Sequence, residues 1–288
     1  MSKLTTEEKN RHNADDLPRI KNHLFYHYRC FIKLLFYFLF GLGAVFVSIF
    51  VFPFIRLFTL KKKDFGIVAR RFISFVFRSF LSILKILRGT KIIISNKDDY
   101  KNLQGKVIVA NHPSILDFVY IMSLVPNSTC IVRGGLTKTP LAGVIKQAYI
   151  TNTTNFDDVC VECKRLVEKG CNVIIFPEGT RTPRHGRNSY KKGAARIALF
   201  CNCNVQPIFI GGSDKYGLGK HDKLWSTNPV EQYLYDFKLL PEIDIQEFKS
   251  LSEPIAAKHL TEKMETNILA AAEEYKENHP LCITINNV

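Results

Sequence analysis

The sequence predicts an α/β fold, in which a mixed, largely parallel sheet flanked by helices follows an N-terminal membrane-embedded helical hairpin. Three observations lead to this prediction. Short apolar runs typical of buried strands recur from residue 91 onward, with helix-length segments between them. Before them, the 19 residues of Leu34–Phe52 include no charged side chain. Residues 1–91 also carry 17 Lys and Arg against 5 Asp and Glu, so most of the net charge of +14 lies beside that apolar stretch.

The chain divides by composition into three segments. Residues 1–29 are polar and mixed in charge, and we expect a loosely ordered lead-in there. Residues 30–90 contain the two apolar helices of a membrane anchor, and residues 91–288 contain the α/β domain. A signal peptide is not indicated, because the apolar stretch begins late, runs long and has no small-residue cleavage site.

The first apolar helix is long enough to cross a bilayer. Its uncharged run extends from Leu34 to Ile55, about 33 Å of helix against a hydrocarbon core of about 30 Å. Lys33 and Arg56 border the run. A buried core helix is the alternative, but Phe and Leu occur on every face. Positive residues lie on both sides, so the positive-inside rule does not orient the helix. Spanning and one-leaflet insertion both stay open.

The second apolar segment, Phe65–Leu87, has cations at regular positions. Arg71, Arg78 and Lys85 recur every seven residues among Phe, Ile, Val and Leu. This pattern is typical of a helix lying in the membrane interface, although a second crossing is the alternative. The location of the charge predicts anionic lipid headgroups as partners and argues against nucleic acid, whose binders carry the positive charge on the folded domain.

The α/β domain is predicted from alternating strand and helix patterns. Gly170 ends one of the helices, and the last helix is expected to cover the sheet. The strands are predicted at residues 91–94, 107–110, 130–132, 172–176 and 205–210, and the helices at residues 114–124, 159–169, 193–200 and 254–278.

The first chemically informative stretch is Asn111-His-Pro-Ser-Ile-Leu-Asp117, which follows a predicted buried strand. Pro113 suits a first helical position, and the residue before a proline avoids the α region. His112 should therefore lie in the turn, where its ring can reach the carboxylate of Asp117 one turn into the helix. Such a carboxylate would fix the tautomer and leave the second ring nitrogen basic. The structural alternative is that both residues serve the helix N-terminus.

A second stretch, Phe176-Pro-Glu-Gly-Thr-Arg181, also follows a predicted strand, and ligands bind at the carboxyl ends of strands in open α/β sheets. The two blocks, in this order and about sixty residues apart, resemble the glycerolipid acyltransferase family, which includes the lysophosphatidate acyltransferases. The resemblance covers about Lys91 to Leu240.

The resemblance implies a catalytic acyltransferase domain over residues 91–288. It implies O-acyl transfer from acyl-CoA or acyl carrier protein to a lysophospholipid, most simply 1-acyl-glycerol-3-phosphate, at the cytosolic face of a cytoplasmic or inner membrane. His112 is expected to act as general base and Asp117 to orient it. The residues expected to bind substrate are Glu178, Gly179, Thr180, Arg181, Arg133 and Lys192. No metal and no cofactor besides the co-substrate is expected.

One position departs from the family pattern. Asn152 stands where these enzymes usually have an arginine that helps to hold the acceptor phosphate, and Arg133 could compensate or be a surface cation. Two alternatives therefore stay open: transfer to another lipid or lipid-linked intermediate from an acyl carrier protein, and a non-catalytic lipid-binding protein.

Other chemistries lack support in the sequence. No Gly-x-Ser-x-Gly motif is present, so a serine acyl-enzyme is not indicated. The glycine-rich residues 211–220 contain no phosphate-binding loop pattern. Cys160 and Cys163 are not followed by a second ligand pair at zinc-site spacing, so the eight cysteines are expected to be unpaired thiols.

Overall fold

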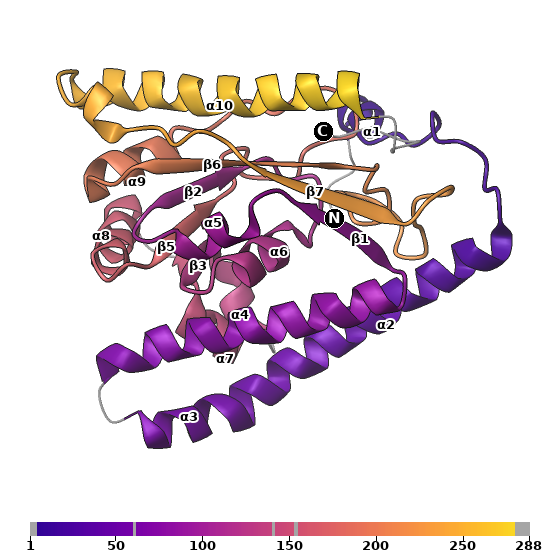
Figure 1. Ribbon diagram of the computed structural model, residues 1–288, viewed down its shortest axis with the longest axis horizontal. Coiled ribbons are helices and arrows are strands. Elements are labelled where there is room, and N and C mark those ends of the chain that lie inside the picture. The colour runs from indigo at the N-terminus through magenta and orange to yellow at the C-terminus, as the bar shows by residue number, and fades with distance from the viewer. Residues whose placement is uncertain (1–4, 60–61, 140–141, 153–154, 280–288) are drawn as a thin grey trace.

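A seven-stranded sheet forms the centre of the protein (Figure 1). The computed structural model describes residues 5–59, 62–139, 142–152 and 155–279, and the statements below concern these residues. The strand order is β1-β7-β6-β2-β5-β3-β4. The strands are β1 (Thr90–Ile94), β2 (Val107–Ala110), β3 (Ser128–Arg133), β4 (Ile150–Asn152), β5 (Asn172–Ile175), β6 (Val205–Gly212) and β7 (Tyr233–Leu239).

Every neighbouring pair of strands is parallel except β6 and β7. This confirms the predicted mixed, largely parallel sheet. The sequence analysis missed β4 and β7. Strand β4 has only three residues, and Asp236 and Lys238 interrupt the apolar pattern of β7. The carboxyl ends of β2, β5 and β3 lie at one edge of the sheet, because these strands are parallel neighbours.

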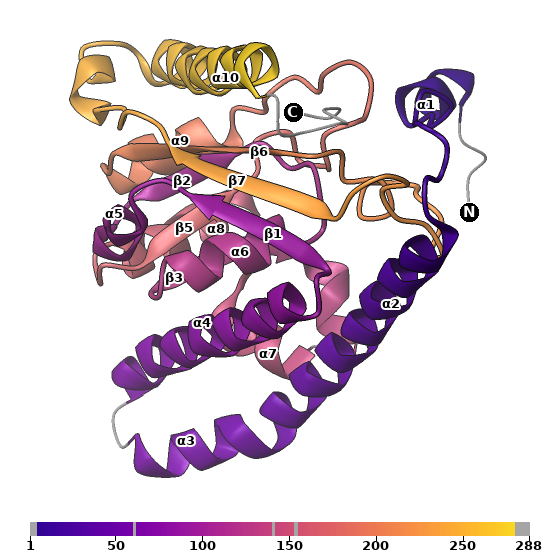
Figure 2. The same ribbon diagram turned by 45° about the vertical axis from the view of Figure 1, so that its right-hand side comes forward.

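Side chains alternate between the two faces of the sheet, as the geometry of a strand requires. Val107 and Val109 pack into a hydrophobic cluster on one face, and Ile108 and Ala110 into a second cluster on the other. Figure 2 shows the sheet between α10 above and α4 below. The helices of the first face are α8 (Phe156–Val167), α9 (Gly193–Cys201) and α10 (Glu253–Asn278).

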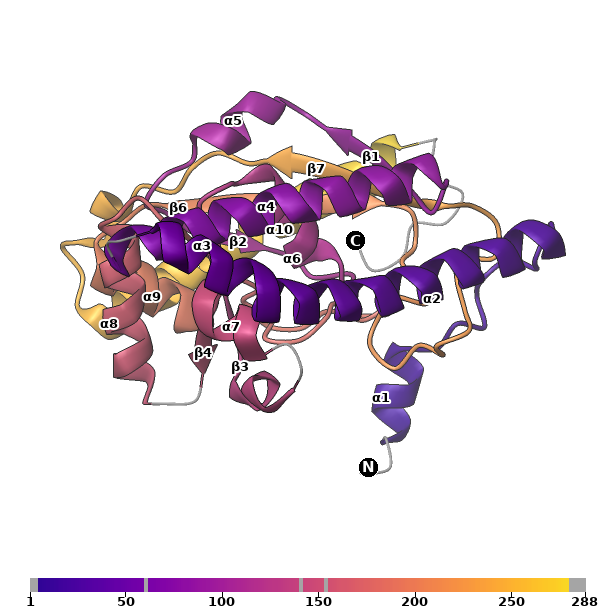
Figure 3. The same cartoon turned by 90° about the horizontal axis from the view of Figure 1, so that it is seen from below.

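The second face is covered by α6 (Asp117–Leu124) and by the N-terminal helical hairpin. In the hairpin, α2 (His23–Phe46) continues through a π-helical turn at Val47–Val51 into α3 (Phe52–Phe58). Helix α4 (Lys62–Ile86) returns alongside it (Figure 3). Shorter helical segments are α1 (Thr6–Arg11), α5 (Lys97–Asn102), η2 (Gly134–Lys138), α7 (Ala142–Ala148) and η3 (Ile245–Phe248).

By length and composition, one helical stretch among the described residues, His23–Phe58, could cross a membrane. It begins earlier than the predicted start at Leu34, because Asn22 caps the helix by accepting a hydrogen bond from the Phe25 N–H. Lys33, expected at the membrane border, is buried. Its Nζ donates to the carbonyls of Gly217 and Ser226, so the first turns of α2 pack on the α/β domain.

Helix α4 has two apolar faces. Ala69, Ile73 and Phe77 are buried in the second cluster, whereas Phe75 and Ile86 are 61% and 77% exposed. The cations Arg71, Arg78 and Lys85 are exposed as well. An interfacial position for α4 stays a prediction, as do the boundaries of the three predicted segments.

Candidate active site

The imidazole of His112 and the carboxylate of Asp117 lie together at the carboxyl end of β2. His112 is in the turn after the strand, and its Nδ1 is 2.8 Å from Oδ2 of Asp117. The carboxylate is fully buried, and the imidazole is 18% exposed. No hydrogen bond engages Nε2 within the described part of the chain. Because the carboxylate accepts the Nδ1 proton, Nε2 is the basic nitrogen of the ring.

Asp117 is the first residue of α6 and not, as the sequence suggested, one turn inside it. Residues 113–116 form a turn before the helix, in which Ser114 contacts the Asp117 carboxylate. The Ser114 N–H donates to Oδ2 at 2.7 Å, and its hydroxyl donates to Oδ1 at 2.5 Å. The Ser114 hydroxyl also lies 2.7 Å from the hydroxyl of Tyr235 on β7. With three donors fixing it at the positive end of a helix, the carboxylate is held in one orientation.

Phe176 supports the His112 ring from the neighbouring strand end. The two rings are stacked, with centroids 4.0 Å apart and an interplanar angle of 16°. Both line a cavity of about 310 Å³ whose other walls are almost entirely apolar and come from α2, α4, β3 and α7. A second apolar cavity of about 280 Å³ lies beside it. The two share Phe40, Phe80 and Phe118.

Glu178 lies under the site and joins the two sequence blocks. It is 4% exposed, and its Oε1 accepts from the backbone N–H of His112 and the hydroxyl of Thr182. Asn188 donates to Oε2 at 2.8 Å. Burial raises the pKa of Glu178, and the hydrogen bonds from Thr182, Asn188 and His112 oppose this rise. The Thr182 N–H donates to the His112 carbonyl at 2.8 Å. Hydrogen bonds at both the N–H and the carbonyl of His112 thus link the two loops.

The N-terminal segment packs on the loop that follows Arg181. Arg11 donates to the Asn188 side chain at 2.8 Å, and so reaches the residue that holds Glu178. Arg184 is 7% exposed and forms ion pairs with Asp16 and with the buried Asp214. The guanidinium of Arg184 is thus occupied by these ion pairs, and the lead-in is docked here and not loosely ordered.

Gly179 adopts a left-handed conformation with φ +68°, which only glycine reaches without strain. Its N–H donates to the Phe176 carbonyl at 2.9 Å and closes the turn, so this donor does not face a substrate. A Cβ at this position would lie 2.8 Å from Nζ of Lys191, so the Lys191 side chain covers the glycine. Thr180 is half-buried, and Lys192 is exposed just before α9.

Arg181 extends from the end of the second block to the loop that follows β6. Its Nη1 donates to the carbonyls of Leu218 and Gly219, at 2.9 and 2.7 Å. Burial lowers the pKa of its guanidinium, with Asp222 and Asp117 among the groups that oppose this. The side chain is therefore fixed near the carboxylate of the His–Asp pair, with further N–H donors left on its fork.

Arg133 and Asn152 are neighbours in the β3–β4 ladder. The register thus places Arg133 at the strand position beside Asn152. The side chain of Arg133 lies outside the described residues, and its contact with a phosphate stays a prediction. Asn152 is exposed.

Four residues that contribute to the site were not predicted from the sequence. Phe176 belongs to a quoted block, and its position at a strand end beside His112 was the available signal. Asn188 donates to Glu178, and Thr182 contacts both Glu178 and the backbone of His112; no spacing rule indicates either residue. Tyr235 lies in the missed strand β7, so its hydrogen bond to Ser114 could not be found.

The fold and this site together define an α/β protein that presents a histidine–carboxylate pair at the carboxyl edge of its sheet, against an apolar cavity and behind an apolar helical hairpin. The sequence model of the acyltransferase family matches residues 91–211. Over these residues the chain has an acyltransferase-family domain, as the two blocks indicated.

Relatives and a solved structure agree with this assignment. A chloroplastic 1-acyl-sn-glycerol-3-phosphate acyltransferase of Arabidopsis thaliana is 28% identical over 185 residues, which are 61% of this chain and 50% of that protein. The Brassica napus relative is 33% identical over 115 residues, 38% of this chain and 33% of its own. The matches thus span half or less of these two plant proteins. A Borreliella burgdorferi relative is 20% identical over 67% of this chain and 80% of its own.

The crystal structure of PlsC, the 1-acyl-sn-glycerophosphate acyltransferase of Thermotoga maritima, superposes with a TM-score of 0.62. The match covers 86% of this chain and 97% of that chain, at 21% sequence identity. The likeness shows a shared fold.

Proposed function

We propose that the protein transfers a fatty acyl group from an acyl thioester to the free hydroxyl of 1-acyl-glycerol-3-phosphate. The observation that carries this proposal is the His112–Asp117 pair, whose imidazole opens into an apolar cavity. The relatives named 1-acyl-sn-glycerol-3-phosphate acyltransferases support the choice of acceptor.

In the proposed reaction, Nε2 of His112 takes the proton from the acceptor hydroxyl as its oxygen attacks the thioester carbonyl carbon. A carbon–oxygen bond forms, the carbon–sulfur bond breaks, and the leaving thiolate takes the proton back from the imidazolium. Asp117 stabilises the imidazolium and holds the ring. Glu178 positions His112 from beneath through its backbone N–H and does not contact substrate.

The two apolar cavities suit the two acyl chains that such a reaction brings together. Both are lined by apolar side chains and share the wall formed by Phe40, Phe80 and Phe118. Arg181 supports binding of the acceptor phosphate, because a guanidinium with free donors suits a phosphate oxygen. The cavity that His112 lines is the better place for the chain that is transferred.

The donor is acyl-CoA or acyl-acyl carrier protein, and no further cofactor takes part. The apolar hairpin supports membrane insertion, with the α/β domain on the cytosolic face and anionic headgroups as partners. The uncharged Asn152 favours the second candidate, transfer to another lipid or lipid-linked acceptor.

The test is acyl transfer from labelled donor by purified protein, with panels of donors and acceptors. His112→Ala should abolish transfer and leave expression and membrane association intact. The matched control is His259→Ala, an exposed histidine on α10 paired with Glu262, which should not alter the rate. Transfer by His112→Ala at near wild-type rate would refute the base assignment, and a wild-type protein that binds lipid without turnover would favour the non-catalytic alternative.

Arg181→Ala should raise the KM for the acceptor by about tenfold or more, the value of one charge-assisted phosphate contact, and change the KM for the donor far less. Arg187→Ala is the control, because the side chain of this exposed arginine pairs with Glu273. An unchanged acceptor KM would remove Arg181 from the phosphate site.

A further inference from the structure

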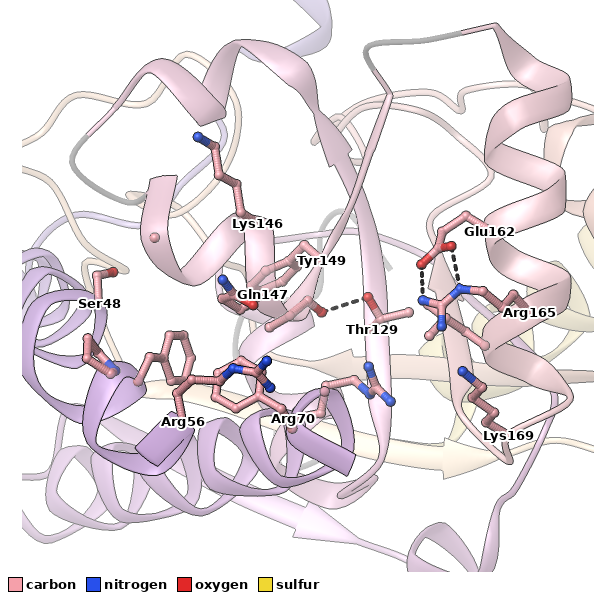
Figure 4. A pocket seen from close by; sticks show the side chains of 17 residues that line it. Ser48, Arg56, Arg70, Thr129, Lys146, Gln147, Tyr149, Glu162, Arg165 and Lys169 are labelled. Atoms are coloured by element: carbon pink, nitrogen blue, oxygen red, sulfur yellow. Dashed lines mark hydrogen bonds and ion pairs between the residues drawn. The ribbon is translucent and has the colours of Figure 1, made fainter. Parts of the chain in front are cut away.

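Figure 4 shows a cavity of about 820 Å³ that His112 does not line. Tyr149 forms a wall between it and the cavity beside His112, because it lines both. Its walls come from α3, α4, α7 and α8. Thr129, near the start of β3, and Lys169, just before β5, both line it. His112 follows the other, carboxyl end of the parallel strands. The cavity therefore does not belong to the proposed active site.

The cavity is strongly basic. Arg56 and Arg70 come from the helical hairpin and lie opposite Arg165 of α8 and Lys169, which follows that helix (Figure 4). Lys146 of α7 adds a fifth cation. The acid lining the cavity is Glu162, and it is already bound in a two-pronged ion pair with Arg165, with one contact of 2.7 Å. The remaining four cations are left without this counter-charge.

Arg70 is the informative member of this set. It is 5% exposed, and its Nε donates to the side-chain oxygen of Asn127 at 3.0 Å. Within the described residues, no carboxylate lies at ion-pair distance from its guanidinium. A buried cation is costly unless an anion accompanies it. The planar fork keeps N–H donors for a bidentate contact with phosphate.

The surroundings of the cavity indicate the source of that anion. Phe52 and Pro53 of α3 form part of its wall. On the same short helix, Phe54, Leu57 and Phe58 are 60%, 74% and 73% exposed, an apolar surface suited to lipid. A phosphate reaching this cavity from the lipid side would have its acyl chains beside these side chains.

We propose that this cavity binds the phosphate group of an anionic phospholipid, with Arg70 as the central ligand and Arg56 and Lys169 on either side. The bound headgroup bridges the hairpin to α8 and offsets the repulsion between their cations. It is a lipid site distinct from the proposed acceptor site, and its existence does not depend on acyl transfer.

The experiment measures equilibrium binding of short-chain phosphatidylglycerol to the purified full-length protein in detergent. This lipid is neither acceptor nor product of the proposed reaction, so failure here and failure of the proposed function are distinguishable. Arg70→Met should weaken binding about tenfold or more, the value of a lost charge-assisted contact. Arg71→Gln is the matched control: it removes a cation one position along α4, is exposed, and lies outside the cavity.

A double variant, Arg56→Gln with Lys169→Gln, changes two exposed residues and covers the case in which Arg70→Met does not fold. It should weaken binding by at least about threefold. Short-chain phosphatidylcholine and inorganic phosphate serve as probes of the headgroup charge and of the acyl chains, and both should bind at least tenfold more weakly than phosphatidylglycerol.

Three results would overturn the proposal. Unchanged affinity in Arg70→Met and in the double variant would show that phosphatidylglycerol binds elsewhere. Equal losses in Arg71→Gln and Arg70→Met would show attraction to the overall positive charge. Inorganic phosphate binding as tightly as phosphatidylglycerol would make the cavity a site for a free anion.

Discussion

Asp117→Asn isolates the charge of the carboxylate from its geometry. Oδ2 accepts from the backbone N–H of Ser114 as well as facing Nδ1 of His112, so only an oxygen fits that position. The amide NH₂ of an asparagine must then replace Oδ1, opposite the Ser114 hydroxyl. That hydroxyl can accept the amide proton and donate its own to Tyr235. The imidazole thus keeps its tautomer, and the variant loses only the negative charge.

The size of the effect follows from this geometry. A full charge about 4 Å from the imidazolium centre is worth about 4 kcal/mol at an effective dielectric constant of 20. Hydrogen bonds to charged and neutral partners differ by about 1–2 kcal/mol, which sets the lower limit. At about 1.4 kcal/mol per factor of ten, we expect kcat/KM to fall by about 10- to 1,000-fold. Where an asparagine instead inverts the tautomer of a catalytic histidine, the loss reaches about 10⁴-fold.

The assay is steady-state acyl transfer by Asp117→Asn in detergent, with the thermal midpoint Tm measured on the same preparation to verify folding. The loss should appear in kcat, because Asp117 is buried and does not touch substrate. A change of less than threefold would show that the carboxylate does not stabilise the transition state. A loss beyond 10⁴-fold in a folded protein would show that Ser114 does not orient the amide.

Three further predictions test the groups around the pair. Tyr235→Phe removes one hydrogen bond to Ser114 and should lower kcat by about tenfold or less with an unchanged acceptor KM; a KM effect alone would contradict a positioning role. Because burial raises the pKa of Glu178, the folded protein favours its protonated form, so its contribution to stability is greatest below pH 4.5 and falls as the pH rises through the raised value. The Tm of the wild type should therefore fall relative to that of Glu178→Gln as the pH rises from 4.5 to 8. A relative rise would refute this assignment. Arg184→Ala leaves its buried carboxylate partner unpaired and should cost about 3–5 kcal/mol, seen as a Tm lower by about 10 °C, whereas the exposed Arg187→Ala should lie within about 1 °C of wild type.

The sheet could be predicted from sequence where its strands are buried on both faces. Strands β2, β5 and β6 are rich in Val and Ile because helices cover both faces of the sheet, and such runs stand out in a sequence. Strand β7 was missed because Asp236 lies within it, next to His279 at 3.3 Å. A residue whose partner lies more than forty positions away gives no local pattern.

The two parts of the candidate site, the His112–Asp117 pair and the surroundings of Glu178, also differ in how far apart the contacting residues lie in the sequence. His112 and Asp117 are five residues apart, so turn and helix geometry was enough to predict that they meet. Glu178 was expected to bind substrate, as the resemblance implies. In the structure it is buried and bonded to the His112 backbone. Its role depends on Thr182 and Asn188, which are brought back by a loop that no periodicity describes.

The Lys and Arg residues of the first 91 positions have several different roles, which their number alone does not reveal. Composition predicted one function for it, attraction to anionic headgroups. In the structure, Lys33 is buried against backbone carbonyls, and Arg11 reaches the loop beside the candidate active site. Arg71 is exposed, whereas its neighbour Arg70 is buried beside the basic cavity. Adjacent residues on a helix point about 100° apart, so two consecutive arginines that look equivalent in sequence meet different surroundings. A lipid-binding pocket and a lipid-facing surface can therefore arise from one basic stretch, and the comparison of Arg70→Met with Arg71→Gln separates them.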